Sequence, residues 1–306
     1  MKINGKKVWI HGSIVHQVVC IFIAMAAFGE SKHQAKKKNG GKPPRGKVYA
    51  STTMTSYLNI CVAFVKWARK EHRCRTVSGA YIYVAEYLTL KIKRGNRPCT
   101  LHKIASALAK LYRVASTEFG VKLPDRERKD VIRNKSADPR FDILKYGDLY
   151  AFMINTGLRR KELKLIRPED VTLTEDGTCM IHVRCGKGGK KRDFAALSTE
   201  PYRIAQAAMQ AGAELIFPKI PKYCACHYYR KVFATALYFQ HAVSLETLTR
   251  GEKYYCAKEL QGVVYCKSAM KTVSRALGHE RLDVVTRYLL VAPGDPRCTD
   301  PKPGIA

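Results

Sequence analysis

The stretch TGLRRKEL, residues 156–163, decides how the rest of the chain is interpreted. Four further signals follow it in order: GKG at 186–188, HYYR at 227–230, LGH at 277–279, and Tyr288, nine residues after the histidine of LGH. Each of these signals would arise by chance in many proteins. Together and in this order they bring two arginines, two histidines, a lysine and a tyrosine into one sequence pattern.

This pattern resembles that of the tyrosine site-specific recombinases, the phage integrase family. Residues 156–163 resemble its first arginine box. HYYR resembles its His-x-x-Arg box, a likeness strengthened by the VFAT that follows at 232–235. LGH resembles its third box, and nine residues is the spacing at which the family places its nucleophilic tyrosine. GKG looks like its catalytic lysine hairpin.

The resemblance covers residues 138–292 closely and 48–120 more loosely. It implies a mostly α fold, in which a small helical core-binding domain grips DNA and a mainly helical catalytic domain contains a small β-hairpin. We therefore predict an N-terminal segment and basic arm over 1–46, a core-binding domain over 47–120, a linker over 121–137 and a catalytic domain with its tail over 138–306.

The motif residues suit the cleavage of a phosphodiester without a metal or other cofactor. Arg159 and Arg230 can clamp the non-bridging oxygens in fork geometry and neutralise the extra charge on pentacoordinate phosphorus. His227 and His279 can add hydrogen bonds or move a proton. Glu162 is expected to hold an arginine in place rather than to react.

Tyr288 is the predicted nucleophile and Lys187 the predicted general acid. A tyrosine of ordinary pKa near 10 is only about 0.1% ionised at pH 7, so it needs nearby cations or a base. Lys187, on a glycine turn, can reach and protonate the leaving 5′ oxygen, although Lys190 and Lys191 stand close enough to compete. The covalent 3′-phosphotyrosyl intermediate conserves the bond energy, so rejoining needs no ATP.

The charge of the chain points to nucleic acid. Its 306 residues include 55 Lys and Arg against 25 Asp and Glu, a net charge of +30, and 46% are hydrophobic, which is ordinary for a globular protein. A field this positive attracts polyanions. A merely basic globular protein remains the alternative on charge alone.

Three amphipathic helices are expected in the first domain: one behind Ser51 or Thr52, one with an apolar stripe from Val77 to Ile92, and one capped by Thr100. Cations lie between the apolar stripes, which suits a module that contacts a phosphate backbone. The cations predicted to contact DNA are Lys66, Arg69, Lys70, Arg94 and Lys103.

The N-terminal segment has two unusual stretches. Ile14–Phe28 is apolar, but at about 15 residues it is too short to span a bilayer; we interpret it as a packed helix, with a targeting role as the alternative. Lys36–Lys47 (KKKNGGKPPRGK) is basic and rich in turn-forming residues, and is expected to be irregular. It could serve as a solvated tether or as an arm that contacts phosphates.

The eleven cysteines are odd in number and scattered, which favours a reducing cytoplasm. The cluster Cys224-Ala225-Cys226-His227 lacks a second ligand pair, so no metal site is predicted. Cys256 and Cys266 could face each other across a hairpin, with reduced thiols as the default.

In the catalytic domain, strands are expected at 179–184 and 192–197. The stretch from 250 to 271 makes the interval between the second and third boxes about twice that of compact family members. Gln261-Gly262 predicts a hairpin there. It could track DNA, meet a neighbouring protomer, or be an inert elaboration. The tail after Tyr288 has little apolar surface for docking on another subunit.

The resemblance implies a homotetramer on double-stranded DNA with inverted-repeat sites, exchanging strands through a Holliday junction. We interpret its role as integration or excision of a mobile element, with an accessory DNA-bending or directionality protein as a further partner and no membrane association. The alternatives are a type IB topoisomerase, which would relax DNA as a monomer, and a catalytically inactive DNA-binding relative.

Overall fold

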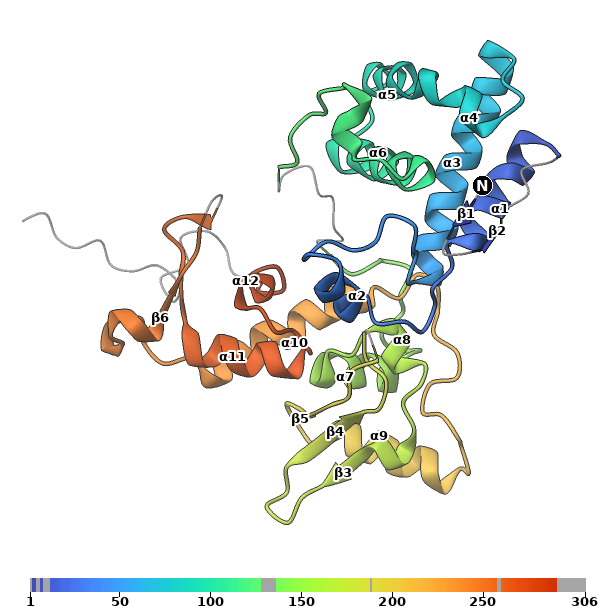
Figure 1. Ribbon diagram of the computed structural model, residues 1–306. Helices are drawn as coiled ribbons and strands as arrows, with labels where there is room; N and C mark the ends of the chain where they lie inside the picture. The colour runs from blue at the N-terminus through green and yellow to red at the C-terminus, as the bar shows by residue number, and fades with distance from the viewer. Residues whose placement is uncertain are drawn as a thin grey trace, which may run out of the picture. The chain divides into compact units, whose positions relative to one another are not determined.

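The computed structural model describes residues 2–3, 6–7, 12–127, 136–187, 189–257 and 260–290. Contacts divide the chain into two compact units, residues 1–132 and 133–306. Both units are mostly helical, as the sequence predicted (Figure 1). The small antiparallel sheets expected in the second unit are present, and the first unit has an additional two-stranded pairing that the sequence did not predict.

The first unit is a helical module around one apolar core. Phe64, Leu88 and Leu108 are fully or almost fully buried at its centre. A two-stranded pairing of β1 and β2 precedes the helices. Its elements are β1 (Lys2–Ile3), β2 (Lys6–Lys7), α1 (Ile14–Ala24), α2 (Lys32–Lys38), α3 (Ser51–His72), α4 (Val77–Ala80), α5 (Val84–Lys93) and α6 (Pro98–Tyr112), with 3-10 turns η1 (Tyr81–Tyr83) and η2 (Ser116–Phe119).

Helix α1 is part of this core, in keeping with the prediction of a packed helix. The Ser13 side chain caps it by accepting a hydrogen bond from the His16 N–H, and Val18 and Phe22 are fully buried. Buried Gln17 also accepts a hydrogen bond from the Val77 N–H at 3.0 Å, which links α1 to α4. Helix α1 therefore packs with the helices α3, α4 and α6 of the same unit.

Two predicted helices differ in detail. The expected helix from Val77 to Ile92 is divided into α4, a 3-10 turn and α5; Ser78 and Gly79, both weak helix formers, lie in its first turn. The third helix begins at Pro98 rather than behind Thr100. Proline suits the first turn of a helix because the N–H that it lacks would have no intrahelical partner there.

The basic stretch 36–47 is only partly irregular. The expectation is wrong for Lys36–Lys38, which form the last turn of α2, with Ser31 accepting a hydrogen bond from the Gln34 N–H at its start. The remainder is tied to its own unit, because Lys110 Nζ donates to the carbonyls of Pro44 and Lys47, both at 3.3 Å.

The second unit combines a three-stranded sheet with helices that pack around α10 (Figure 1). Phe152 of α7, Phe233 of α10 and Ile181 of β4 are fully buried in its core. Its helices and strands are α7 (Gly147–Thr156), α8 (Arg160–Leu163), β3 (Val171–Leu173), β4 (Cys179–Val183), β5 (Arg192–Ala195), α9 (Glu200–Gln210), α10 (Cys226–His241), β6 (Lys253–Tyr255), β7 (Val264–Cys266), α11 (Lys267–Ala276) and α12 (Leu282–Val285), with 3-10 turns η4 (Pro168–Asp170), η5 (Leu245–Thr247) and η6 (Arg250–Glu252).

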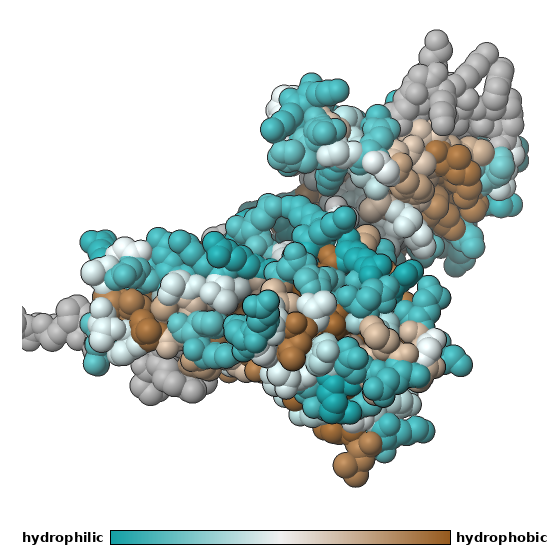
Figure 2. Space-filling view, turned by 90° about the horizontal axis from the view of Figure 1, so that it is seen from below, coloured by the Kyte–Doolittle hydropathy of each residue, from teal (hydrophilic) through white to brown (hydrophobic). Residues whose placement is uncertain are grey.

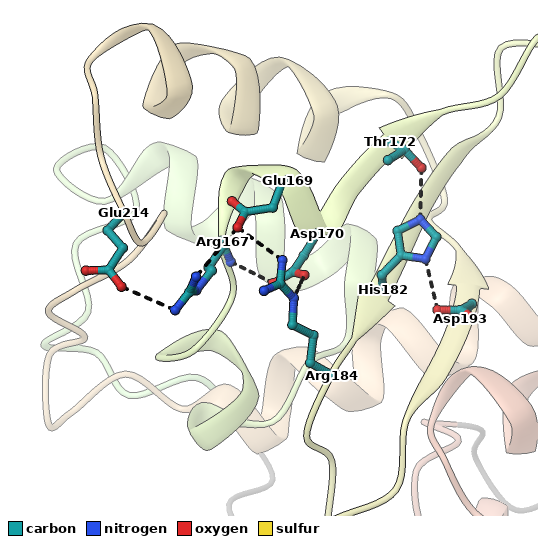
Figure 3. A network of polar contacts seen from close by, with 8 residues as sticks. All are labelled: Arg167, Glu169, Asp170, Thr172, His182, Arg184, Asp193 and Glu214. Carbon is teal, nitrogen blue, oxygen red and sulfur yellow. Dashed lines mark hydrogen bonds and ion pairs between the residues drawn. The ribbon is translucent and has the colours of Figure 1, made fainter.

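The predicted strand pair is present as β4 and β5, and the sequence analysis missed β3, which pairs with the other edge of β4. His182 of β4 links all three strands: its Nε2 lies 2.9 Å from Thr172 Oγ1 of β3, and its Nδ1 lies 2.9 Å from Asp193 Oδ1 of β5 (Figure 3). The sheet therefore gives a braced base to the hairpin that carries Lys187.

Carboxylates of η4 anchor the strand that leads into this hairpin. Arg184, directly after β4, donates from Nε to buried Asp170 and from Nη2 to Glu169 at 3.1 Å (Figure 3). Asp170 also accepts a hydrogen bond from the Arg167 N–H at 3.0 Å, and so caps its own short helix. One leg of the Lys187 hairpin is thus fixed to the body of the unit.

The stretch from 250 to 271 contains the predicted hairpin, formed by β6 and β7 with Gly262 at a positive φ of 90°. Cys266 is opposite Lys253, and the Cys256 N–H bonds to the Val263 carbonyl, so the two cysteines do not face each other. Residues 258–259 of this stretch and the tail from 291 lie outside the described residues.

The face shown in Figure 2 is mostly hydrophilic, with apolar residues in patches between polar ones. Within the described ranges, every helix is too short or too polar to traverse a membrane.

Candidate active site

Among the described residues of the second unit, Arg230 is the most deeply buried charge. Its exposed fraction is 0%, and its Nη1 and Nη2 donate to the carbonyls of Gly157 and Leu277, both at 2.5 Å. Burial and, next, the nearby Arg159 lower the pKa of Arg230 to about 10, so it remains charged at neutral pH. Both bonds are accepted by neutral backbone carbonyls rather than by a carboxylate, so they do not neutralise the charge of Arg230. The buried positive charge is therefore suited to binding an anion.

Arg159 shares one of these acceptors. Its Nη2 donates to the Leu277 carbonyl at 3.1 Å, while its Nη1 donates to Glu162 Oε1 at 2.7 Å. Glu162 Oε2 also accepts a hydrogen bond from the Arg159 N–H at 2.9 Å, capping α8. One backbone carbonyl of the third box therefore joins the arginines of the first and second boxes.

Gly157 allows this junction. It ends α7 at a φ of +56°, and a Cβ on it would lie 2.3 Å from Cδ1 of buried Phe233. A residue with a side chain would therefore be strained in its backbone and would collide with α10. The glycine of the first box lets α7 and α10 approach until Arg230 reaches the Gly157 carbonyl.

Gly157→Ala should destabilise the protein by about 2–5 kcal/mol, about 1–2 from the left-handed backbone and about 1–3 from overpacking. Urea unfolding, followed by circular dichroism, measures the change. Gly177→Ala is the matched control, because Gly177 has a φ of +81° but nothing within 4 Å of an added Cβ. Equal losses in the two variants would show that contact with Phe233 contributes nothing.

His279 and Tyr288 stand beside Arg230. The His279 and Tyr288 ring centroids are 5.2 Å apart, and the Arg230 guanidinium carbon lies 5.3 Å from the Tyr288 ring centroid. Backbone hydrogen bonds hold both residues: the His279 N–H donates to the Ser274 carbonyl, and the Tyr288 N–H donates to the Val285 carbonyl, both at 2.8 Å.

Two buried polar atoms of this cluster, His279 Nε2 and Arg230 Nε, have no hydrogen-bond partner among the described residues. A buried polar atom without a partner costs about 1–3 kcal/mol, so such atoms in a native fold call for an explanation. Phosphate oxygens could accept from Arg230 Nε, and from His279 Nε2 where it carries the proton.

We expect His279 to remain neutral down to mildly acidic pH. Burial lowers its pKa, and the surrounding cations, led by Arg230 and Arg159, lower it further, to about 4. Arg159→Ala should raise this pKa, because one cation that opposes protonation is removed. NMR titration of the His279 ring carbons measures it, with Arg140→Ala, an exposed arginine paired with Asp138, as the control. A wild-type pKa at the ordinary 6.5 would contradict the expected environment.

Lys187 shares a hollow with part of this cluster. It lies on the exposed turn between β4 and β5. Lys190, a competitor for its role, is paired with Glu280. The hollow, of about 110 Å³, is lined by Arg159, Lys187, Lys190, Lys191, Arg192, Gly278, His279 and Glu280.

His227 occupies the first turn of α10 and is exposed. It is three residues before Arg230, so the two side chains extend from the same side of the helix. The loop before it is held by Arg160, whose guanidinium donates to the carbonyls of Pro221 at 2.9 Å and of Cys224. The structure thus gathers Arg159, Arg230, His279 and Tyr288, with Lys187 on a shared hollow and His227 one helical turn away.

Arg192, at the start of β5, is a site residue that the sequence analysis did not single out. Its Nη1 and Nη2 donate to Glu162 Oε1 and Oε2 at 3.0 and 2.8 Å, and its Nε donates to the Ala276 carbonyl at 2.9 Å. Burial raises the pKa of Glu162, but the hydrogen bonds led by that from Arg192 outweigh it and hold the pKa at about 2. The only signal in the sequence was a cation directly after the glycine and lysine turn.

Glu162 is therefore placed as expected, between arginines. The cysteines of the 224–227 cluster are buried with their Sγ atoms 3.7 Å apart, whereas His227 is exposed. In the described part of the chain, no three His, Cys, Asp or Glu side chains are grouped as metal ligands. In the first unit, the cations predicted to contact DNA are all exposed: Lys66, Arg69, Lys70, Arg94 and Lys103.

No protein-family model matches the chain, and no curated protein matches it. Among solved structures, it is similar to the Tn1549 transposon integrase in complex with transposon right end DNA, with 14% identity, a TM-score of 0.43, and coverage of 86% of this chain and 95% of that one. It is also similar to the XerH site-specific recombinase bound to a palindromic difH substrate (13% identity, TM-score 0.48, covering 92% and 94%) and to the XerA recombinase (13%, 0.32, 92% and 95%).

At these identities and TM-scores the similarity identifies no residue's role.

Proposed function

We propose that this protein is a site-specific DNA recombinase that cleaves and rejoins DNA through a 3′-phosphotyrosyl bond at Tyr288. The observation that carries this proposal is the buried, charged Arg230, which lies against the Tyr288 ring and shares the Leu277 carbonyl with Arg159. In this arrangement the two guanidiniums can neutralise the charge of a phosphodiester. The tyrosine, which lies beside Arg230 and the neutral histidine, can act as the nucleophile.

In the proposed reaction the Tyr288 Oη attacks phosphorus, and its proton passes to solvent water as the Oη–P bond forms. The bond between phosphorus and the 5′ oxygen breaks, and Lys187 donates a proton to that oxygen. Arg159 and Arg230 stabilise the charge on the non-bridging oxygens, at about 2.7–4 kcal/mol for each donor removed. Attack of a 5′ hydroxyl on the phosphotyrosine reverses these steps.

His279, neutral at pH 7, would donate a hydrogen bond from its protonated ring nitrogen to a phosphate oxygen without adding charge. The His227 side chain would approach the phosphate from the first turn of α10, three residues before Arg230. In the first unit, Lys66, Arg69, Lys70, Arg94 and Lys103 would contact DNA phosphates and position the duplex rather than read its sequence. The same proposal includes inverted-repeat DNA sites, a tetramer of the protein and a Holliday junction as the intermediate. It also includes a mobile element as the biological context.

Covalent capture tests this function. Duplexes that bind the chain are first selected from a random pool with Tyr288→Phe, a variant that is expected to bind without cleaving. The wild-type protein is then incubated with the selected duplex, nicked near its centre, in excess EDTA, because arginines and histidines supply the charge neutralisation. A covalent complex on denaturing gels, with the phosphorylated peptide containing Tyr288, is the expected result.

A strict requirement of the chemical step for Mg²⁺, or no adduct on any selected duplex, would overturn the proposal. Two paired sites then distinguish exchange from relaxation. Joint molecules with four DNA arms are expected of a recombinase, whereas relaxation of supercoiled DNA without such molecules would indicate a topoisomerase.

A further inference from the structure

We propose that Arg192 is a positioning residue that neutralises Glu162 and so leaves the charge of Arg159 available to the DNA phosphate. This inference rests on the proposed function, because it assigns a role to Arg192 within the same site. Arg192 itself lies at the base of the hairpin and donates hydrogen bonds to protein atoms, two to Glu162 and one to the Ala276 carbonyl.

The charge balance around Glu162 is the first step. The side chains of Glu162, Arg159 and Arg192 are 3%, 15% and 10% exposed, so water screens them little. Two guanidiniums share one carboxylate, and one positive charge remains. Without Arg192, Glu162 and Arg159 would form a neutral pair in a low-dielectric environment, where such attraction is strong.

The geometry of the carboxylate is the second step. Each Glu162 oxygen accepts two bonds: Oε1 from the side chains of Arg159 and Arg192, and Oε2 from the Arg192 side chain and the Arg159 backbone. Arg192 is therefore bidentate, whereas the Arg159 guanidinium uses only Nη1 on Glu162. The Glu162 carboxylate is therefore bound by two guanidinium bonds from Arg192, which takes no part in the proposed reaction, and by only one from Arg159.

The position of Arg192 in the chain is the third step. An added Cβ on Gly186, directly before Lys187, would lie 2.9 Å from Arg192 Nη1, and one on Gly278, directly before His279, would lie 3.0 Å from its Cδ. Two glycines thus permit the Arg192 side chain to pass between the hairpin and the third box. Together with Arg184 on Asp170 at the other leg, it fixes both ends of the Lys187 turn.

The test uses substitutions at Arg192 that separate charge from shape. Arg192→Gln keeps a donor for Glu162 but removes the charge, Arg192→Lys keeps the charge, and Glu162→Gln/Arg192→Gln removes both charges. The rate of covalent complex formation on the selected duplex is the first readout. The affinity for inorganic phosphate, followed through the His279 ring signals in NMR, is the second and needs neither DNA nor the nucleophile.

Arg192→Gln should lower both rate and affinity by about 10–100-fold, as is common when a partner of a reacting group is lost. Arg192→Lys should lose less, and the double variant should recover at least about tenfold over Arg192→Gln, because Arg159 again has no carboxylate to neutralise it. A purely structural brace would make the double variant as poor as the single one, and that result with folded proteins would overturn the inference.

The two proposals can fail separately. If wild-type protein forms no adduct but phosphate affinity follows the expected order of variants, the proposed function fails and the charge role of Arg192 stands. If adducts form at Tyr288 but all Arg192 variants match the wild type in both readouts, only the role of Arg192 fails.

Discussion

Tyr288→Phe is expected to reduce the covalent protein–DNA complex to below detection while leaving DNA binding intact. The phenylalanine ring can keep its place beside His279 and the Arg230 guanidinium, but it has no oxygen to attack phosphorus. Denaturing gels measure the adduct and mobility shifts measure binding, on the same selected duplex. This is the largest effect that any single substitution should have.

Tyr228→Phe is the matched control, since Tyr228 lies in the HYYR motif and is also half-buried. Its ring packs against that of Tyr229 at 5.5 Å, which in turn contacts Tyr150 in the core. Tyr228→Phe should therefore form the adduct at close to the wild-type rate. An adduct from Tyr288→Phe, or loss of the adduct in Tyr228→Phe, would show that the nucleophile is misassigned.

Lys187→Ala should slow cleavage by roughly 10²–10⁴-fold, the usual loss when a general acid is removed. The defect should largely disappear on DNA with sulfur in place of the 5′-bridging oxygen at the cleaved position. A thiolate leaves without needing a proton, so the acid becomes unnecessary. Rates of adduct formation on matched oxygen and sulfur duplexes measure the rescue.

Three variants make this result specific. Lys190→Ala and Lys191→Ala remove cations that line the same hollow, and neither should show rescue by sulfur. Arg159→Ala should also stay impaired on the sulfur duplex, because charge on the non-bridging oxygens is still uncompensated. Rescue of Lys190→Ala or Lys191→Ala in place of Lys187→Ala would move the general acid further along the turn.

The sequence predicted the site well at positions where a motif and the local backbone conformation require the same residue type. Gly157 illustrates this: its place in TGLRRKEL predicted a box, and the positive φ and contact with Phe233 explain why glycine is needed there. The sequence motifs also assigned Arg159, Arg230, His279 and Tyr288 to one site, and these four residues lie together in the structure.

The sequence was less informative where a role depends on contacts between distant residues. Arg192 is one cation among 55, and its importance emerges only when β5 brings it to Glu162, 30 residues earlier. Strand β3 has three residues, too few for alternation to be recognised, and it is defined by its pairing with β4. Similarly, nothing local in the sequence reveals that Gln17 of α1 bonds to Val77 of α4.

The shared Leu277 carbonyl makes the two arginines mechanically interdependent. Because both guanidiniums bond to the same oxygen, a small shift of the chain after α11 would remove one hydrogen bond from each of them. The acceptor is a main-chain atom, which no side-chain substitution deletes. Alanine scanning would therefore overlook the one acceptor that Arg159 and Arg230 share.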